Sequence, residues 1–147
     1  MPRNSVDYEE DFYRWTAEQA ELLRSGEFSA IDAVNIAEEI ESMGRSDRRE
    51  IRSWLIVLLT HLLKWRFQPG TRSAGWSGTI REQRQQIELI LEDSPSLRPL
   101  IEQFLPRAYS AARINAAEET GLPEADPPED CPFTGDEVMS APLYPEP

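Results

Sequence analysis

The segment between residues 46 and 67 constrains the fold more than any other, because apolar residues occupy nearly every side of its helical wheel. The main stripe consists of Ile51, Trp54, Leu55, Leu58, Leu62 and Trp65, and three further apolar residues lie outside it, Ile56, Val57 and Leu63. A helix that is apolar nearly all round is normally buried by neighbours on several sides. We therefore expect a central helix that is capped by Ser46 or Asp47 and ends near Phe67, before Pro69-Gly70.

The rest of the chain also shows helical spacing, with apolar residues at three- and four-residue steps and no alternating pattern typical of strands. Further helices are expected over residues 7–25 and 29–43, from between 73 and 79 to 92, and from between 94 and 98 to 121. Asp7 is the expected N-cap of the first helix, and Gly44 is expected to end the second. Pro106 is expected to kink the last helix or to divide it in two.

The tail, residues 122–147, has a different composition, with seven of the 12 prolines, seven acidic residues and no Lys or Arg. Such a composition usually indicates disorder, but the tail also carries apolar residues: Leu122, Phe133, Val138, Met139, Leu143 and Tyr144. We expect it to dock at least as far as Phe133, and Thr134 with Glu137 to cap one short turn of helix. The predicted fold is all-α: a compact bundle of about five helices over residues 1–121, with the Pro-rich acidic tail packed over it as part of the same domain.

Three features of the sequence predict a cytoplasmic protein that is not in a membrane. Cys131 is the only cysteine, so no disulfide framework within the chain is available. The N-terminal residues lack the apolar stretch of a signal peptide. The longest apolar run, residues 54–63, is far shorter than the roughly 20 residues that a membrane-spanning helix needs.

The net charge of -12 is distributed unevenly. Residues 1–44 contain eleven acidic and three basic residues, whereas residues 45–84 contain three acidic and nine basic ones. The basic run at the start of the central helix could bind phosphate or nucleic acid: Arg45, Arg48, Arg49 and Arg52. The favoured interpretation is that these arginines pair with Glu38, Glu39 and Glu41 on the preceding helix, folded back beside them. The overall negative charge argues against nucleic acid as a partner, because phosphate neutralisation dominates such binding.

Glu38 and Glu41, three residues apart, match half of the magnesium site in all-α nucleotide pyrophosphohydrolases. That site needs a second acidic pair on a neighbouring helix, and no later pair matches it. The two glutamates are therefore only weak metal candidates, and no metal or cofactor is expected. Ion pairing is the favoured role for them, with the candidate partners Arg48, Arg52, Arg81 and Arg84.

His61 is the only histidine, and helical spacing places it with Trp54 and Trp65 at one edge of the buried stripe. A histidine hydrogen-bonded at the border of the core is the favoured interpretation, and a proton carrier with a shifted pKa is the alternative. We expect the second, third and fourth helices to meet at this edge. Glu38 or Glu41 and Arg81 or Arg84 would then converge near His61 as a partly buried polar seam.

The sequence contains no phosphate-binding loop, dinucleotide-binding fingerprint, hydrolase serine motif or zinc-protease motif. The predicted function is a non-enzymatic protein-interaction module with an unidentified protein partner, and a homodimer is compatible with the sequence. The alternative is an enzyme or toxin-like effector that acts on a phosphate-bearing nucleotide or nucleic acid. In that case His61 or Glu41 would be the acid or base, and the anion site would consist of Arg48, Arg52, Lys64, Arg81 and Arg84.

Several motifs occur in an order that resembles a known family. They are YEEDFYRW (8–15), AEEIESMGR (37–45), HLLKW (61–65), IREQRQQI (80–87), ILEDSPSLRP (90–99), ETGLP (119–123) and DCPF (130–133). Between about Tyr8 and Tyr144 the chain resembles a bacterial family known as domain of unknown function 29. The resemblance implies a compact all-α fold, and it brings no established activity and no catalytic residues.

Overall fold

The computed structural model describes residues 7–140, and all regular structure in that range is helical. Its five α-helices are α1 (Phe12–Arg24), α2 (Ala33–Phe67), α3 (Ala74–Asp93), α4 (Leu100–Thr120) and α5 (Gly135–Met139), and short 3₁₀ turns occupy Phe28–Ala30, Pro69–Thr71 and Pro95–Leu97. The predicted all-α class is confirmed, and the total of five helices agrees with the predicted number. The helices expected at 29–43 and 46–67 are joined in α2, and α5 lies in the tail. The chain divides into two compact units, Met1–Ser46 and Asp47–Pro147. The predicted organisation, a bundle over residues 1–121 with the tail as part of the same domain, stays a prediction.

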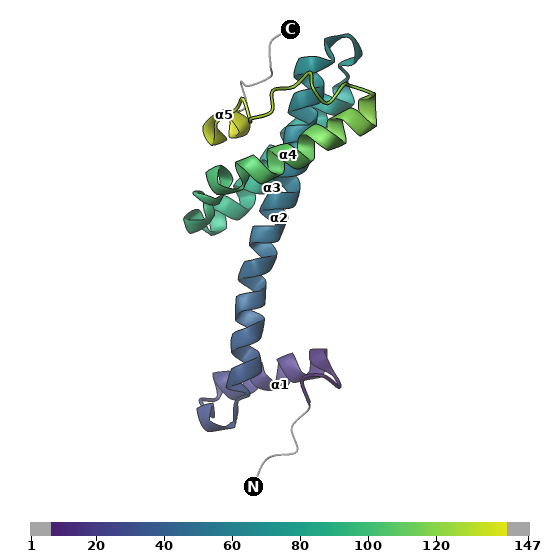
Figure 1. Ribbon diagram of the computed structural model, residues 1–147. Helices are drawn as coiled ribbons and strands as arrows, with labels where there is room; N and C mark the ends of the chain where they lie inside the picture. Colours follow the sequence, from purple (N-terminus) through teal and green to yellow (C-terminus); the bar gives the residue numbers. More distant parts are fainter. Residues whose placement is uncertain (1–6, 141–147) are drawn as a thin grey trace. The chain divides into compact units, whose positions relative to one another are not determined.

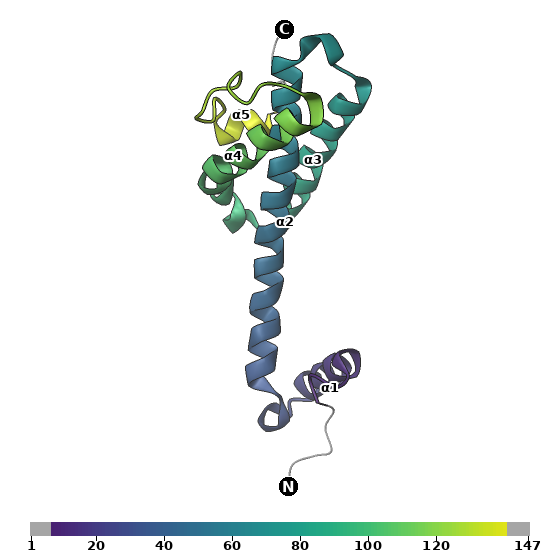
Figure 2. The same ribbon diagram turned by 45° about the vertical axis from the view of Figure 1, so that its right-hand side comes forward.

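The second unit is a helical bundle around one apolar core. In both views α3 and α4 lie against the C-terminal part of α2, and α5 lies beside α4 (Figure 1 and Figure 2). Every one of these helices contributes buried side chains, which include Leu55, Leu58, Leu62, Ile80, Ile87, Leu105, Ala112 and Val138. As predicted, the apolar residues of α2 after position 50 form the centre of this core.

The described part of the tail belongs to the same core. Leu122, Phe133 and Val138 are buried with the helices of the bundle. Thr134 begins α5 with a capping box, in which its hydroxyl accepts from the Glu137 N–H and the Glu137 carboxylate accepts from the Thr134 N–H. The buried side chains of the described tail thus extend from Leu122 to Val138. Two of the apolar tail residues that were expected to dock, Leu143 and Tyr144, lie outside the described residues.

The first unit joins α1 to the start of α2 through partly buried polar contacts. The Trp15 indole Nε1 donates to an Asp32 carboxylate oxygen over 3.1 Å, and the Asp32 N–H donates to the Gln19 side chain over 2.7 Å. The prediction that Asp7 caps α1 is wrong. Asp11 is the N-cap and accepts from the Arg14 N–H, because the residues between 7 and 11 form a turn.

The predicted helix end at Gly44 is also wrong, since α2 is one helix of 35 residues. Gly26 and Gly121 adopt the left-handed conformation that ends a helix, with φ values of 79° and 75°, whereas Gly44 does not. A glycine inside a helix costs only about 1 kcal/mol relative to alanine, and good helix formers flank this one. Ser46 and Asp47 therefore lie within α2 and cap nothing.

The remaining helix ends agree closely with the sequence prediction. α2 ends at Phe67 before Pro69, Ser73 caps α3 by accepting from the Trp76 N–H over 3.2 Å, and Gly121 ends α4. Pro106 lies inside α4, so the predicted alternative of two separate helices is wrong. No helix in the described range 7–140 has the length and apolar character needed to cross a membrane.

Candidate functional site

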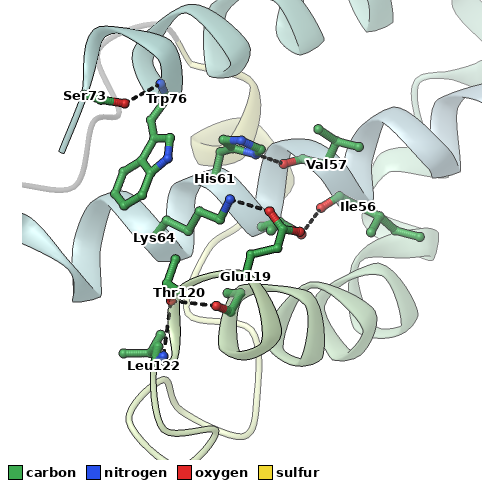
Figure 3. A network of polar contacts seen from close by, with 11 residues as sticks. Ile56, Val57, His61, Lys64, Ser73, Trp76, Glu119, Thr120 and Leu122 are labelled. Atoms are coloured by element: carbon green, nitrogen blue, oxygen red, sulfur yellow. Dashed lines mark hydrogen bonds and ion pairs between the residues drawn. The ribbon is translucent and has the colours of Figure 1, made fainter. Parts of the chain in front are cut away.

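The most unusual polar group in the bundle is a buried lysine. Lys64 lies among the core residues of α2 with 6% of its surface exposed, and its ammonium forms an ion pair with the Glu119 carboxylate from the end of α4. The Trp76 ring of α3 lies 5.6 Å from the same ammonium, in cation–π geometry. Figure 3 shows the three side chains converging from three helices. Because a buried charge needs a partner, this contact joins α2, α3 and α4.

His61 lies one turn before Lys64 and is partly exposed (Figure 3). Its Nδ1 is 2.9 Å from the Val57 carbonyl oxygen, so Nδ1 carries the proton and donates. Burial lowers the pKa of His61 below its usual value, and the Lys64 cation lowers it further against the opposing effects of Val57 and Glu119. His61 is thus a neutral imidazole at the border of the core near neutral pH.

The predicted polar seam around His61 depended on a helix end at Gly44, and α2 does not end there. A convergence of Glu38 or Glu41 with His61 stays a prediction. The acidic partner that reaches the vicinity of His61 is Glu119.

The arginine run on α2 is exposed. Arg45 pairs with Glu38 over 2.7 Å, and this is the one ion pair that the run makes with a residue in the range 7–140. Arg48, Arg49 and Arg52 are exposed. The pairing with Glu38, Glu39 and Glu41 therefore holds for one arginine of four, because the helix carrying the acids does not turn back.

Two of the other anion-site candidates are engaged within the bundle. Arg84 is buried, and its Nε donates to the Val138 carbonyl oxygen over 2.8 Å, which ties α3 to α5. Arg81 is exposed and donates to the Ser77 hydroxyl over 3.3 Å. Lys64 is paired with Glu119. Two of the five candidate cations therefore have structural roles.

A second candidate site lies on the N-terminal part of α2, where large apolar side chains face solvent. Ile36 is partly exposed, Ile40 is 59% exposed and Met43 is 64% exposed. Their spacing of four and three residues places them on one face of the helix, and we call these three residues the α2 apolar stripe. Val34, which is 81% exposed, falls on the opposite side of the helix.

Metal binding has no geometric support in the described part of the chain. No group of three or more His, Cys, Asp and Glu side chains within residues 7–140 is arranged to hold a metal ion. Glu38, one of the two weak metal candidates, is engaged with Arg45.

Sequence reasoning missed Glu119, the partner of the one lysine. The two residues are 55 positions apart, so no helical spacing relates them. One sequence signal was available: Lys64 is a cation in the middle of an apolar helix, and such a residue requires an acidic partner from another element.

Comparison with known proteins identifies the family of the chain but no individual relative. No similar curated protein and no similar solved structure was found. The family model of domain of unknown function DUF29 matches residues 8–144, which is nearly the whole chain. The chain therefore belongs to the DUF29 family.

Proposed function

We propose that this chain is a protein-interaction module and that it binds its partner through the N-terminal part of α2. The observation that carries the proposal is the α2 apolar stripe, whose Ile40 and Met43 are more than half exposed. Isolated apolar residues are common on protein surfaces. Several on one helical face, spaced as in a helix that packs against another, are typical of an interaction site.

With about 3.6 residues per turn, Glu41, Arg48, Arg49 and Arg52 lie toward the side of α2 that carries Val34, away from the stripe. The interaction site that we propose is therefore the apolar stripe itself, without these charges. The ion pair of the buried Lys64 with Glu119 has a structural role in this proposal, because with Trp76 it joins three helices of the bundle.

Photo-crosslinking in living cells tests the proposal. A photoreactive phenylalanine analogue is placed at Met43 of the full chain, and in a matched variant at Gln85, an exposed residue of α3. We expect a discrete higher-mass adduct from position 43 and none from position 85. The absence of an adduct at 43, or equal adducts at both positions, would refute the proposal.

A second candidate function is the binding of a phosphate-bearing nucleotide or nucleic acid. The exposure of Arg48, Arg49 and Arg52 favours it, because free guanidinium groups bind phosphate well. The structural roles of Lys64 and Arg84 weigh against the larger anion site. Thermal-shift measurements with nucleotides, with and without Mg²⁺, test this function. A shift that is lost in Arg48→Ala would favour it over the first proposal, and no shift with any nucleotide would rule it out.

A further inference from the structure

We propose that two neighbouring hollows between α4 and the tail bind a polypeptide segment that carries arginine residues. The hollows lie between residues 95–110 and residues 129–139, and we call them together the α4–tail groove. The groove lies wholly within the second unit and shares no residue with the α2 apolar stripe, so this site is independent of the one proposed above. Three observations support it: the size of the hollows, the hydrogen-bonding state of their lining and its charge.

Both hollows have the size of a ligand site. The first, where α5 lies beside α4 (Figure 1), has a volume of about 420 Å³, and its apolar lining consists of Pro95, Pro99, Ile101 and Met139. The second has a volume of about 340 Å³, and its apolar lining consists of Leu105, Pro106 and Tyr109. Ligand sites in proteins typically enclose about 300–1,000 Å³ and are mainly apolar.

The two hollows together are longer than one side chain. Glu102 lines both of them, so they are neighbours along α4. The lining residues of α4 and the turn before it extend from Arg98 to Ser110, which is about 18 Å along a helix. An extended peptide of about five residues has this length. The groove therefore suits a short polypeptide segment that places a side chain in each hollow.

The side-chain donors of the lining are already engaged within the chain. Three hydroxyl or thiol groups donate to backbone carbonyl oxygens: Tyr109 to Pro128, Ser110 to Pro106 and Cys131 to Phe133. Arg98 pairs with Glu88 over 3.3 Å. The lining therefore offers a ligand apolar surface and hydrogen-bond acceptors, and the ligand has to supply the donors.

The acceptors of the lining are carboxylates. Four of them face one cation, Arg98, among the lining residues: Glu102, Glu129, Asp130 and Asp136. Glu102 accepts from the Gly135 N–H over 2.6 Å. The other three are exposed and form no ion pair with any residue that the structure describes. The groove thus has a surplus of negative charge for which the described chain supplies no cation.

Arginine has the chemistry that this lining requires. A guanidinium group carries five N–H donors and no acceptor, and it forms paired hydrogen bonds with a carboxylate. Its aliphatic stem can lie on apolar surface such as Pro99 or Leu105 while the charged end reaches a carboxylate. An acidic segment would place like charges together, which suppresses binding.

Fluorescence anisotropy with a labelled peptide tests the proposal. The probe is the pentapeptide Arg-Ala-Arg-Ala-Arg with an N-terminal fluorescein, and the control peptide replaces each arginine by citrulline, which has a similar shape without the charge. The full chain should bind the arginine peptide saturably at one peptide per chain and should not bind the citrulline peptide. No saturable binding would overturn the proposal, and so would equal binding of both peptides, since the site would then recognise apolar surface alone.

Paired variants test the place of binding, because a chain with a net charge of -12 attracts cations generally. Asp130→Asn combined with Asp136→Asn removes one carboxylate from each hollow and should weaken binding by about tenfold, which is 1.4 kcal/mol. Glu82→Gln combined with Glu118→Gln removes the same charge from exposed positions of α3 and α4 outside the groove. This control should change binding by less than about twofold, because salt screens charges that are not in contact. Circular dichroism checks that both variants fold, and equal losses in the two would overturn the proposal.

Discussion

The Lys64–Glu119 pair gives the sharpest test of how the bundle is held together. Glu119→Ala removes the carboxylate and leaves the Lys64 ammonium among core residues without its ion pair. Glu119 lies in the last turn of α4. A negative charge there is unfavourable because of the helix dipole, so without the ion pair its removal would leave stability unchanged or raise it. A loss of stability can therefore be assigned to the pair.

The expected loss lies between two limits. Breaking a fully buried pair costs about 3–5 kcal/mol, whereas an exposed pair contributes about 0–1 kcal/mol. The Lys64 side chain is 7% exposed, as in a buried pair, whereas the Glu119 side chain is 49% exposed, as in a surface pair. The expected cost therefore lies between the two limits. Trp76 continues to stabilise the cation after the change. We expect Glu119→Ala to lower the free energy of unfolding by about 1–3 kcal/mol.

Urea unfolding followed by circular dichroism measures the change. Glu118→Ala is the matched control, since Glu118 is an exposed acid in the same helical turn, and it should change stability by less than about 0.5 kcal/mol. On a Lys64→Met background Glu119→Ala should also cost less than about 0.5 kcal/mol, because no buried charge remains to be stranded. Equal effects of Glu119→Ala and Glu118→Ala would refute the role of the pair.

Three further predictions concern single residues of the bundle. Pro106→Ala should raise the free energy of unfolding by up to about 3 kcal/mol in urea titrations, because Pro106 interrupts the hydrogen bonds of α4; a loss of stability would show that the helix depends on the proline. Gly135→Ala should lower the melting temperature, because the new methyl carbon would lie 2.5 Å from the Glu102 carboxylate that accepts from the Gly135 N–H; an unchanged melt would show that Glu102 moves aside freely. The lowered pKa of His61 means that its neutral form contributes stability above the unfolded-state pKa of about 6.5, and this contribution is lost as the pH falls through the folded-state pKa. The stability difference between wild type and His61→Gln should therefore shrink from pH 7.5 to pH 5.5, and a constant difference would contradict the lowered pKa.

The sequence predicted the bundle well where local signals and burial agree. The apolar surroundings of Leu58 and Leu62 identified the central helix, and Gly121 marked the end of α4 through its left-handed geometry. The capping box of Thr134 and Glu137 was also readable, because its two residues are three positions apart.

The candidate site was harder to predict, because it depends on whether α2 ends or continues at Gly44, and the local sequence does not determine this. A glycine ends a helix only when it adopts a positive φ, and nothing near Gly44 distinguishes it from Gly26 in that respect. The false break at Gly44 led to the predicted fold-back of Glu41 onto the arginines and onto His61. Continuity of α2 instead leaves Met43 and Arg48 exposed on one helix.

Hydrogen exchange with and without the partner that is captured by crosslinking at Met43 tests most directly whether the N-terminal part of α2 is a binding surface. Amides of residues 36–46 should exchange more slowly in the complex than in the chain alone, because the partner protects them. Amides of residues 80–91, which lie in the bundle around Ile80 and Ile87, should exchange at the same rate in both samples. Equal exchange of residues 36–46 in the two samples would contradict binding through α2.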